Sequence, residues 1–161
     1  MPARLIDGRA HARAIRAELK TAVETHRNQR PPGITVIQVG DDPASTVYVR
    51  GKHKAAEEAG FTSAIEHLHD VTQADLHALT DRLAADPAVA GILVQMPLPK
   101  PLNADQALER IPPHKDVDGL HPYNAGRLAQ GNPTFVPATP LGVLELLRRE
   151  GIDPTGKRAV V

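Results

Sequence analysis

Prolines and glycines divide the chain into short segments, and this punctuation limits its fold more than any other feature of the sequence. The 161 residues include 15 prolines and 12 glycines, which are spread along the whole chain rather than pooled in one linker. Between them, stretches rich in β-branched residues alternate with stretches whose apolar residues recur at helical spacing. Strands that alternate with helices need crossover connections. We therefore predict an α/β fold, with a mostly parallel, right-handed sheet flanked by helices in three layers.

The turn signals place the individual elements. Strands are predicted at 4–6, 34–39, 64–68 and 89–94, and 156–161 has the pattern of a strand that is only beginning. Helices are predicted from residue 9 over about twenty residues, from 43 to 60, from 73 to 85, over 104–110 and from 140 to 150. Thr72 with Asp75 is typical of a capping box, and Thr139 with Pro140 is typical of a cap followed by a first-turn proline.

Charge and residue usage argue against several classes of protein. Lysine plus arginine and aspartate plus glutamate each number 19, so no net basic field attracts nucleic acid or an anionic membrane. Aromatic residues make up 2% of the chain, too few for a base-stacking platform. The chain has no cysteine, which excludes disulfides and fits a reducing compartment. No apolar run approaches the ~20 residues that span a bilayer, so we expect a soluble, cytoplasmic protein.

The helix predicted from residue 43 carries polar side chains on one face. Tyr48 and Lys52 are four residues apart, and Ser45 lies three residues before Tyr48, so a hydroxyl, a phenol and an amine are stacked along one stripe. An isolated helix lysine is most often a solvated surface residue. Lys52 therefore becomes a candidate catalytic residue only in combination with other segments.

Two loops supply such segments. Gln95 ends a predicted buried strand and is followed by a rigid proline loop, beginning at Pro97, that can form the wall of an apolar pocket. Asp116 and Asp118 lie two residues apart in a loop before Gly119. Taken alone, this second pattern favours an Asx-type turn over a binding site.

The histidines do not predict a metal site. His67 and His69 have strand spacing, and His114 and His121 flank the aspartate loop. No grouping has a metal-ligand spacing such as H-E-x-x-H, so we interpret these histidines as surface or edge residues and expect no metal cofactor.

Together these segments resemble the bifunctional methylenetetrahydrofolate dehydrogenase/methenyltetrahydrofolate cyclohydrolase family. The resemblance lies in four ordered motifs that extend over most of the chain. They comprise Ser45, Tyr48, Val49, Lys52, Lys54, Ala56, Glu58 and Gly60; Gln95, Pro97, Leu98 and Pro99; Lys115 to Gly119 with 124–128 after it; and Pro137, Thr139, Pro140 and Gly142. The sequence departs from the family at Met96, where leucine is common, and at Ala138, where cysteine is common. Neither departure affects a proposed catalytic role.

The resemblance implies roles for specific residues. Lys52 would be the catalytic lysine, with Tyr48 against the bound folate and Gln95 orienting the lysine. Asp118 would hold the pterin, because a carboxylate accepts both N–H groups that a pteridine presents side by side. Ser45 and Pro97 would complete the substrate site, and Thr139 would lie near the nicotinamide.

The implied reaction interconverts tetrahydrofolate derivatives. Oxidation of 5,10-methylenetetrahydrofolate to the 5,10-methenyl form transfers a hydride to NADP and depends mainly on positioning. Hydrolysis to 10-formyltetrahydrofolate moves protons. Lys52 can accept a proton only as a neutral amine, a form that partial burial and a cationic substrate both favour. Tyr48 would hydrogen-bond that amine or relay a proton through water.

A dinucleotide site is not visible in the sequence. No glycine-rich phosphate loop follows any predicted strand. We therefore expect a folate-binding catalytic domain over 1–150 and, over 151–161, the start of the first strand of a truncated NAD(P)-binding domain that would hold most of the NADP. The sequence does not distinguish NADP from NAD. The chain alone is expected to lack dehydrogenase activity, and its parent enzyme is expected to be a homodimer in one-carbon metabolism and purine biosynthesis.

Two other functions are compatible with the same residues. Lys52 can be the lysine of a Schiff-base enzyme acting on a carbonyl substrate. Alternatively, the chain can be a folate-binding or dimerisation module without catalysis. The family resemblance places both behind folate interconversion. In the family, the helix with Leu141, Leu144 and Leu147 packs between domains, so we also expect exposed apolar surface there.

Overall fold

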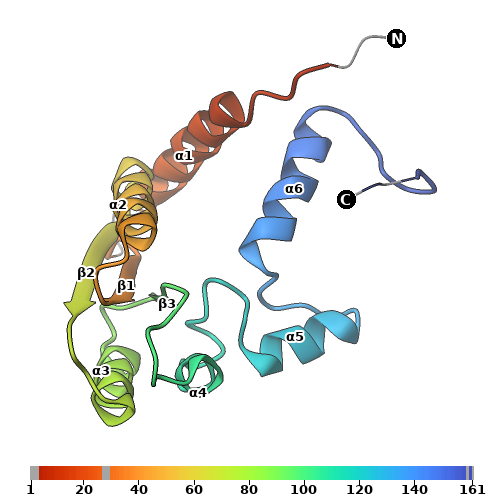
Figure 1. Cartoon of the computed structure of the whole chain (residues 1–161). Helices are drawn as coiled ribbons and strands as arrows, with labels where there is room; N and C mark the ends of the chain where they lie inside the picture. Colours follow the sequence, from red (N-terminus) through yellow and green to blue (C-terminus); the bar gives the residue numbers. More distant parts are fainter. Residues whose placement is uncertain (1–3, 27–29, 159, 161) are drawn as a thin grey trace.

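A small parallel sheet forms the centre of the computed structural model, which describes residues 4–26, 30–158 and 160. The strands are β1 (Gly33–Val39), β2 (Thr62–Leu68) and β3 (Gly91–Val94), in the order β2-β1-β3 (Figure 1). Strand β1 pairs in parallel with β2 along its whole length and with β3 from Ile34 to Ile37. The predicted parallel α/β sheet is confirmed.

Six helices accompany the sheet, and five of them were predicted. They are α1 (Gly8–Thr25), α2 (Pro43–Glu58), α3 (Gln73–Ala85), α4 (Ala104–Glu109), α5 (Pro122–Ala129) and α6 (Ala138–Arg149). The capping box of Thr72 and Asp75 is present at the start of α3. Helix α5 was not predicted, although His121 caps it and Pro122 begins it. Within the described ranges, no helix is long and apolar enough to cross a membrane.

Alternate residues of the strands build two apolar cores, one on each face of the sheet. Ile37 is buried in a cluster with Leu76 of α3. The next residue along the strand, Val36, is buried against Val49 of α2 on the opposite face. Successive strand side chains point to opposite faces, so this alternation creates the three layers. Both helices that pack on β1 are thereby fixed relative to the ends of the strands.

The carboxyl ends of the three parallel strands lie side by side at one end of the sheet. Gly40 follows β1, and Gln95 follows β3 with its backbone N–H donating to the Ile37 carbonyl at 2.8 Å. Asp116 forms a parallel bridge with Ile92 near the start of β3, so the chain that follows it runs along β3 toward this end of the sheet. In open α/β sheets this end is where ligands bind. We therefore expect the predicted site residues to lie at the carboxyl ends of the strands.

Two local predictions were wrong. Residues 4–6 form no strand, and Arg4 instead pairs with Glu150 at 2.7 Å, which ties this segment to the end of α6. Thr139 is not the cap of α6, because the helix begins after Pro137 and has no side-chain cap. The strand expected to begin over 156–161 stays a prediction, because residues 159 and 161 lie outside the described residues and the described part is a turn and irregular chain.

Helix α6 leaves several apolar side chains exposed. It contacts α1, where Arg149 pairs with Glu18 at 2.6 Å, and Figure 1 shows α6 standing apart from the sheet. Leu141, Val143 and Leu144 are each about half exposed. Leu147, which was expected to share this surface, is partly buried. The expected apolar surface is thus present over Leu141 and Leu144.

We predict that this surface binds a hydrophobic dye. The chain should enhance the fluorescence of such a dye more than an ordinary monomer does, because α6 exposes adjacent leucines. Replacing Leu141 and Leu144 together by serine should lower the dye signal without lowering the melting temperature, since neither side chain is buried. A double variant that melts clearly below the parent chain would show that these leucines pack inside the fold.

Candidate functional site

Lys52 and Gln95 meet at the carboxyl end of the sheet. The Nζ atom of Lys52, a half-buried side chain of α2, donates to Oε1 of Gln95 at 3.2 Å. The Nε2 atom of Gln95 in turn donates to the Met96 carbonyl at 2.6 Å, so its amide is held at both ends. Gln95 therefore presents a fixed acceptor to the lysine. The fold therefore brings together Lys52 of α2 and Gln95 after β3, which lie 43 residues apart in the sequence.

The other predicted residues of α2 lie around this pair without contacting the amine. Tyr48 is 66% exposed, and no hydrogen bond joins it to Lys52 within the described residues. Ser45 is 95% buried at the start of the helix, where its backbone N–H donates to the Asp42 carboxylate at 2.7 Å. Tyr48 is thus available to a ligand, whereas the contacts of Ser45 are those of a helix cap.

Asp118 lies in the loop that adjoins this pair. Its side chain is partly buried, and burial raises the pKa of this carboxyl above its ordinary value. The positive charge of Lys52 opposes this effect, while the negative charge of Asp116 adds to it. Burial makes the ionised form of a carboxyl group less stable, and hydrogen bonds donated by a ligand stabilise that ionised form.

Lys115 fixes the start of the aspartate loop. The residue is buried, and its Nζ atom donates to the carbonyls of Ala84 at 2.7 Å and of Asp86 at 2.9 Å, with a longer contact to Leu83. These carbonyls lie at the end of α3, where backbone acceptors lack helical partners and a positive charge is favoured. The Lys115 carbonyl also accepts from the Ile92 N–H at 2.8 Å. The loop is thereby joined to both α3 and β3.

Asp116 fixes the other side of the same loop. Its carboxylate is 99% buried and accepts from the backbone N–H of His121 at 2.9 Å and from Nδ2 of Asn124 at 2.8 Å. Asn124 is equally buried and also accepts from the Thr134 hydroxyl at 2.7 Å. A buried carboxylate is tolerated when several donors satisfy it. This network holds α5 against the loop that carries Asp118.

Glycine is required at the end of the loop. Gly119 has a φ of +68°, and a Cβ atom there would lie 2.7 Å from the backbone carbon of Val136. The Asp118 carbonyl accepts from the N–H of Ala138 at 3.3 Å. The chain that leads into α6 is therefore packed directly on the loop, and only a residue without a side chain permits this close approach.

The remaining predicted residues are less enclosed. Pro97 is exposed at the start of the proline loop after β3, and the Met96–Pro97 peptide bond is cis. Thr139 is exposed in the first turn of α6, one residue beyond the Ala138 N–H that contacts the aspartate loop. Both lie on segments that join the site, and the structure gives neither a contact with Lys52.

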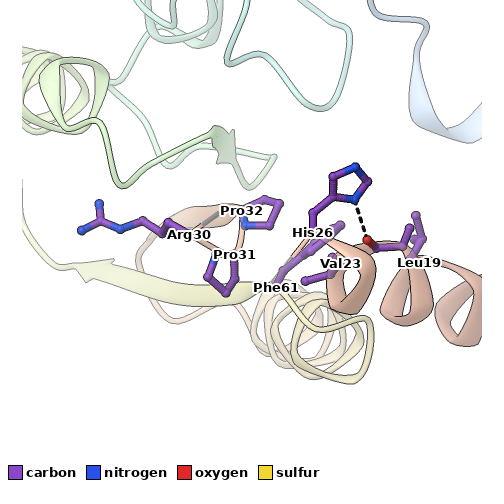
Figure 2. A pocket seen from close by; sticks show the side chains of 8 residues that line it. Leu19, Val23, His26, Arg30, Pro31, Pro32 and Phe61 are labelled. Carbon is purple, nitrogen blue, oxygen red and sulfur yellow. Dashed lines mark hydrogen bonds between the residues drawn. The ribbon is translucent and has the colours of Figure 1, made fainter. Parts of the chain in front are cut away.

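An apolar hollow lies elsewhere on the molecule. Figure 2 shows it between the end of α1, with Leu19 and Val23, and the segment with Pro32 and Phe61. None of the predicted site residues is among those described as lining it. This hollow therefore has no part in the chemistry considered for Lys52 and Asp118.

Three of the predicted surface histidines, His67, His69 and His114, are exposed, His121 is half-buried, and two of the four meet a carboxylate. His67 and His69 at the end of β2 lie beside Asp41, which follows β1. Residues so far apart in sequence come together because the carboxyl ends of paired parallel strands are neighbours. Sequence spacing alone did not reveal this cluster.

Most of this chain matches the model of one known protein family. The family model described as the catalytic domain of tetrahydrofolate dehydrogenase/cyclohydrolase matches residues 6–118, which include Lys52, Gln95 and Asp118. The chain belongs to the tetrahydrofolate dehydrogenase/cyclohydrolase family. The resemblance seen in the four sequence motifs is thereby confirmed.

Curated relatives carry the name bifunctional protein FolD. The relative from Magnetococcus marinus is 52% identical over 99% of this chain and 57% of its own length. The relative from Nitratidesulfovibrio vulgaris is 54% identical over 98% of this chain and 56% of its own length. The chain thus spans somewhat more than half the length of the family members it matches.

Solved structures of family members have the same fold. The FolD methylenetetrahydrofolate dehydrogenase/cyclohydrolase of Campylobacter jejuni superposes with a TM-score of 0.90 at 45% identity, over 93% of this chain and 54% of that one. The enzyme of Trypanosoma brucei, solved with NADP and an inhibitor, gives 0.91 at 42% identity over 98% of this chain and 56% of that one. The arrangement of the sheet and its helices is therefore that of the family.

The sequence did not reveal the residues that support the site of this family member. Lys115 and Asp116 were noted only as part of a motif, and Asn124 had no assigned role. Their partners are backbone groups of α3, α5 and the loops between them, together with the side-chain contacts of Asn124 to Asp116 and Thr134. The available signal was two adjacent charged residues in a loop, which charge patterning alone does not interpret.

We predict that Asp118→Asn stabilises the folded chain at neutral pH. Because burial raises the pKa of Asp118, the folded state binds this proton more tightly than the unfolded state, and stability falls as pH rises through the folded pKa. The asparagine variant lacks this penalty, so its melting temperature should exceed that of the parent at neutral pH, and the difference should vanish in acid. Thermal melts across this pH range measure both.

The exposed carboxylate of Glu109 provides the control. Glu109→Gln should show no comparable gain at neutral pH. Equal melting temperatures for Asp118→Asn and the parent chain at neutral pH would contradict the assigned effect of burial.

Proposed function

We propose that this chain binds tetrahydrofolate derivatives and supplies the proton-transfer residues of a methylenetetrahydrofolate dehydrogenase/methenyltetrahydrofolate cyclohydrolase. The observation that supports this most strongly is the hydrogen bond from Lys52 to Gln95 beside a carboxyl group destabilised by burial. In this proposal Lys52, Tyr48 and Gln95 are catalytic, and Asp118, Ser45 and Pro97 bind substrate together with Tyr48 and Gln95.

Lys52 would act in the hydrolytic step. Water adds to the cationic methenyl carbon, forming a C–O bond, and the proton it loses passes to the lysine amine. The hydroxyl formed in this way then loses its second proton as its C–O bond becomes the formyl carbonyl, the bond from this carbon to one folate nitrogen breaks, and that nitrogen takes up a proton, which leaves the 10-formyl product. Gln95 accepts one N–H of the amine and so orients its lone pair toward the water. Tyr48, exposed one turn away, lies against the folate in this arrangement.

Asp118 would hold the pterin. Two neighbouring N–H donors of the ring fit one carboxylate, and such charge-assisted pairs are strong when water is excluded. Hydrogen bonds to the ionised carboxyl would offset the effect of burial. The bound ring and the amine of Lys52 would then face each other across the edge of the sheet, because both side chains adjoin the same space.

NADP does not fit the described residues as a complete ligand. Thr139 is exposed in the first turn of α6, a helix without a side-chain cap, and it offers a polar contact on the nicotinamide side. No glycine-rich loop in the described ranges forms a phosphate cradle after any of the three strands. We propose that residues 1–150 form the folate-binding domain, that 151–161 begin the strand of an NAD(P)-binding domain, and that NADP is held mainly by that domain.

The parent enzyme is proposed to be a cytoplasmic homodimer. Strand β2 lies at the edge of the sheet and pairs only with β1 in the described part of the chain, so its outer side can pair with a second copy. The proposed cytoplasmic location is based on the residue usage of the sequence, which has no cysteine and so fits a reducing compartment. A 10-formyl product is a one-carbon donor, which is the basis of the proposed link to purine biosynthesis.

We predict that Asp118→Ala abolishes most folate binding by the chain. Loss of two hydrogen bonds to a charged acceptor costs about 1.5–3 kcal/mol or more, a roughly 10- to 150-fold rise in Kd. Isothermal titration with a tetrahydrofolate derivative measures the change, and Glu109→Ala serves as the control. Unchanged affinity in Asp118→Ala would show that the pterin is held elsewhere.

We predict that Lys52→Gln removes cyclohydrolase turnover from a full-length enzyme. The measurement uses a chimera in which the chain replaces the matching 57% of the Magnetococcus marinus relative. Loss of the base should lower hydrolysis of methenyltetrahydrofolate by about 10²–10⁴-fold. Hydride transfer should fall less, because it requires positioning rather than a base.

Lys54 offers a matched control two residues along the same helix. Its side chain is 78% exposed and lies 4.0 Å from Glu58, so Lys54→Gln should leave turnover unchanged. Intact hydrolysis in the Lys52→Gln chimera would show that another group moves the proton.

A further inference from the structure

Three metal-ligating side chains gather at the end of β2, apart from the folate site. The Nε2 atom of His67 lies 3.4 Å from Oδ1 of Asp41, and the Nδ1 atom of His69 lies 3.2 Å from Oδ2 of the same carboxylate. One ligand atom from each of the three residues lies within 4.8 Å of the others. All three are exposed, so a cation can reach them from solvent. None contacts Lys52, Gln95 or Asp118 through a described hydrogen bond.

The spacing of these atoms is close to that of a tetrahedral site. Zinc binds imidazole nitrogen and carboxylate oxygen at about 2.0–2.2 Å, which places neighbouring ligand atoms of a tetrahedral site about 3.3–3.5 Å apart. Each histidine nitrogen lies at about this separation from one oxygen of Asp41, at 3.4 and 3.2 Å, although the two contacts are to different oxygens, so a small side-chain rotation brings both nitrogens beside one oxygen. Two imidazoles and one carboxylate also form a ligand set that suits zinc and similar first-row cations rather than magnesium or calcium.

The backbone already holds the ligands in place. His67 is paired in register with Gln38 of β1, and the Gly40 N–H donates to the Leu68 carbonyl at 2.9 Å. The loop with Asp41 is therefore fixed to the end of β2. The imidazole rings of His67 and His69 lie with their centroids 4.3 Å apart. Little ordering is needed to bring the three side chains onto one ion.

One existing hydrogen bond must be exchanged on binding. The Nε2 atom of His67 lies 2.9 Å from the Gly40 carbonyl, and it would turn its lone pair to the cation instead. The Gly40 carbonyl does not become unpaired, because Nε2 of Gln38 also donates to it at 3.2 Å. The exchange therefore leaves no buried acceptor without a partner.

We propose that Asp41, His67 and His69 bind one divalent first-row cation of the zinc type, with water in the remaining position. The ion would join the end of β2 to the loop that precedes α2. This site takes no part in the reaction proposed above and does not depend on it. Its ligands come from two neighbouring strand ends, and sequence spacing alone cannot reveal such a set.

Zinc titration of the tag-free chain tests this site. Calorimetry at neutral pH should show one ion per chain, with a Kd on the order of micromolar for an open three-ligand site. His67→Ala and His69→Ala should each weaken binding by roughly tenfold or more. Asp41→Ala should do the same. His26→Ala, which removes another exposed histidine, should bind as the parent chain does.

A cobalt titration provides a second readout that does not depend on variants. Co²⁺ in this site should give the visible absorption of a tetrahedral nitrogen and oxygen environment, and zinc should displace it. Circular dichroism should show that the three exposed-site variants remain folded. The proposal is overturned if no saturable binding occurs, if the bound cobalt is octahedral, or if the His67 and His69 variants bind as tightly as His26→Ala.

Discussion

Two adjacent buried charges determine the position of the candidate site. Lys115 caps the end of α3 through backbone carbonyls, and Asp116 accepts hydrogen bonds from the start of α5 and from Asn124. Each charge is satisfied by several partners, which is the condition for burying it at tolerable cost. The two residues point to different sides of one short loop. They therefore fix the loop that carries Asp118 at the carboxyl end of the sheet.

The remaining site depends on this placement. Lys52 extends from α2 and Gln95 follows β3, and both helix and strand are positioned by the packing on β1. Asp118 completes the arrangement on the side fixed by the buried charges. Its partly buried carboxyl lowers the stability of the folded state, which is a common property of groups held ready for a ligand. The burial of Asp118 thus lowers the stability of the free chain, and the proposed hydrogen bonds from a pterin would offset this effect.

The sequence predicts the elements whose signals are local. The β-branched run of β1, the capping box of α3 and the proline-started α2 were predicted because each is specified by neighbouring residues. Residues 4–6 were assigned wrongly, since a short apolar run does not show whether a strand lies beside it. Helix α5 was missed because its eight residues are too few for a clear apolar period. Lys52, Gln95 and Asp118 were found through motif resemblance, whereas the partners of Lys115 and Asp116 become visible only after folding.

The decisive measurement is a structure of the chain with a bound tetrahydrofolate derivative. We expect the pteridine to donate two hydrogen bonds to the Asp118 carboxylate. The one-carbon group should then lie beside Nζ of Lys52, with Gln95 still accepting from the amine. A pteridine that binds in the apolar hollow beside Phe61, or anywhere out of reach of Asp118 and Lys52, would contradict the account.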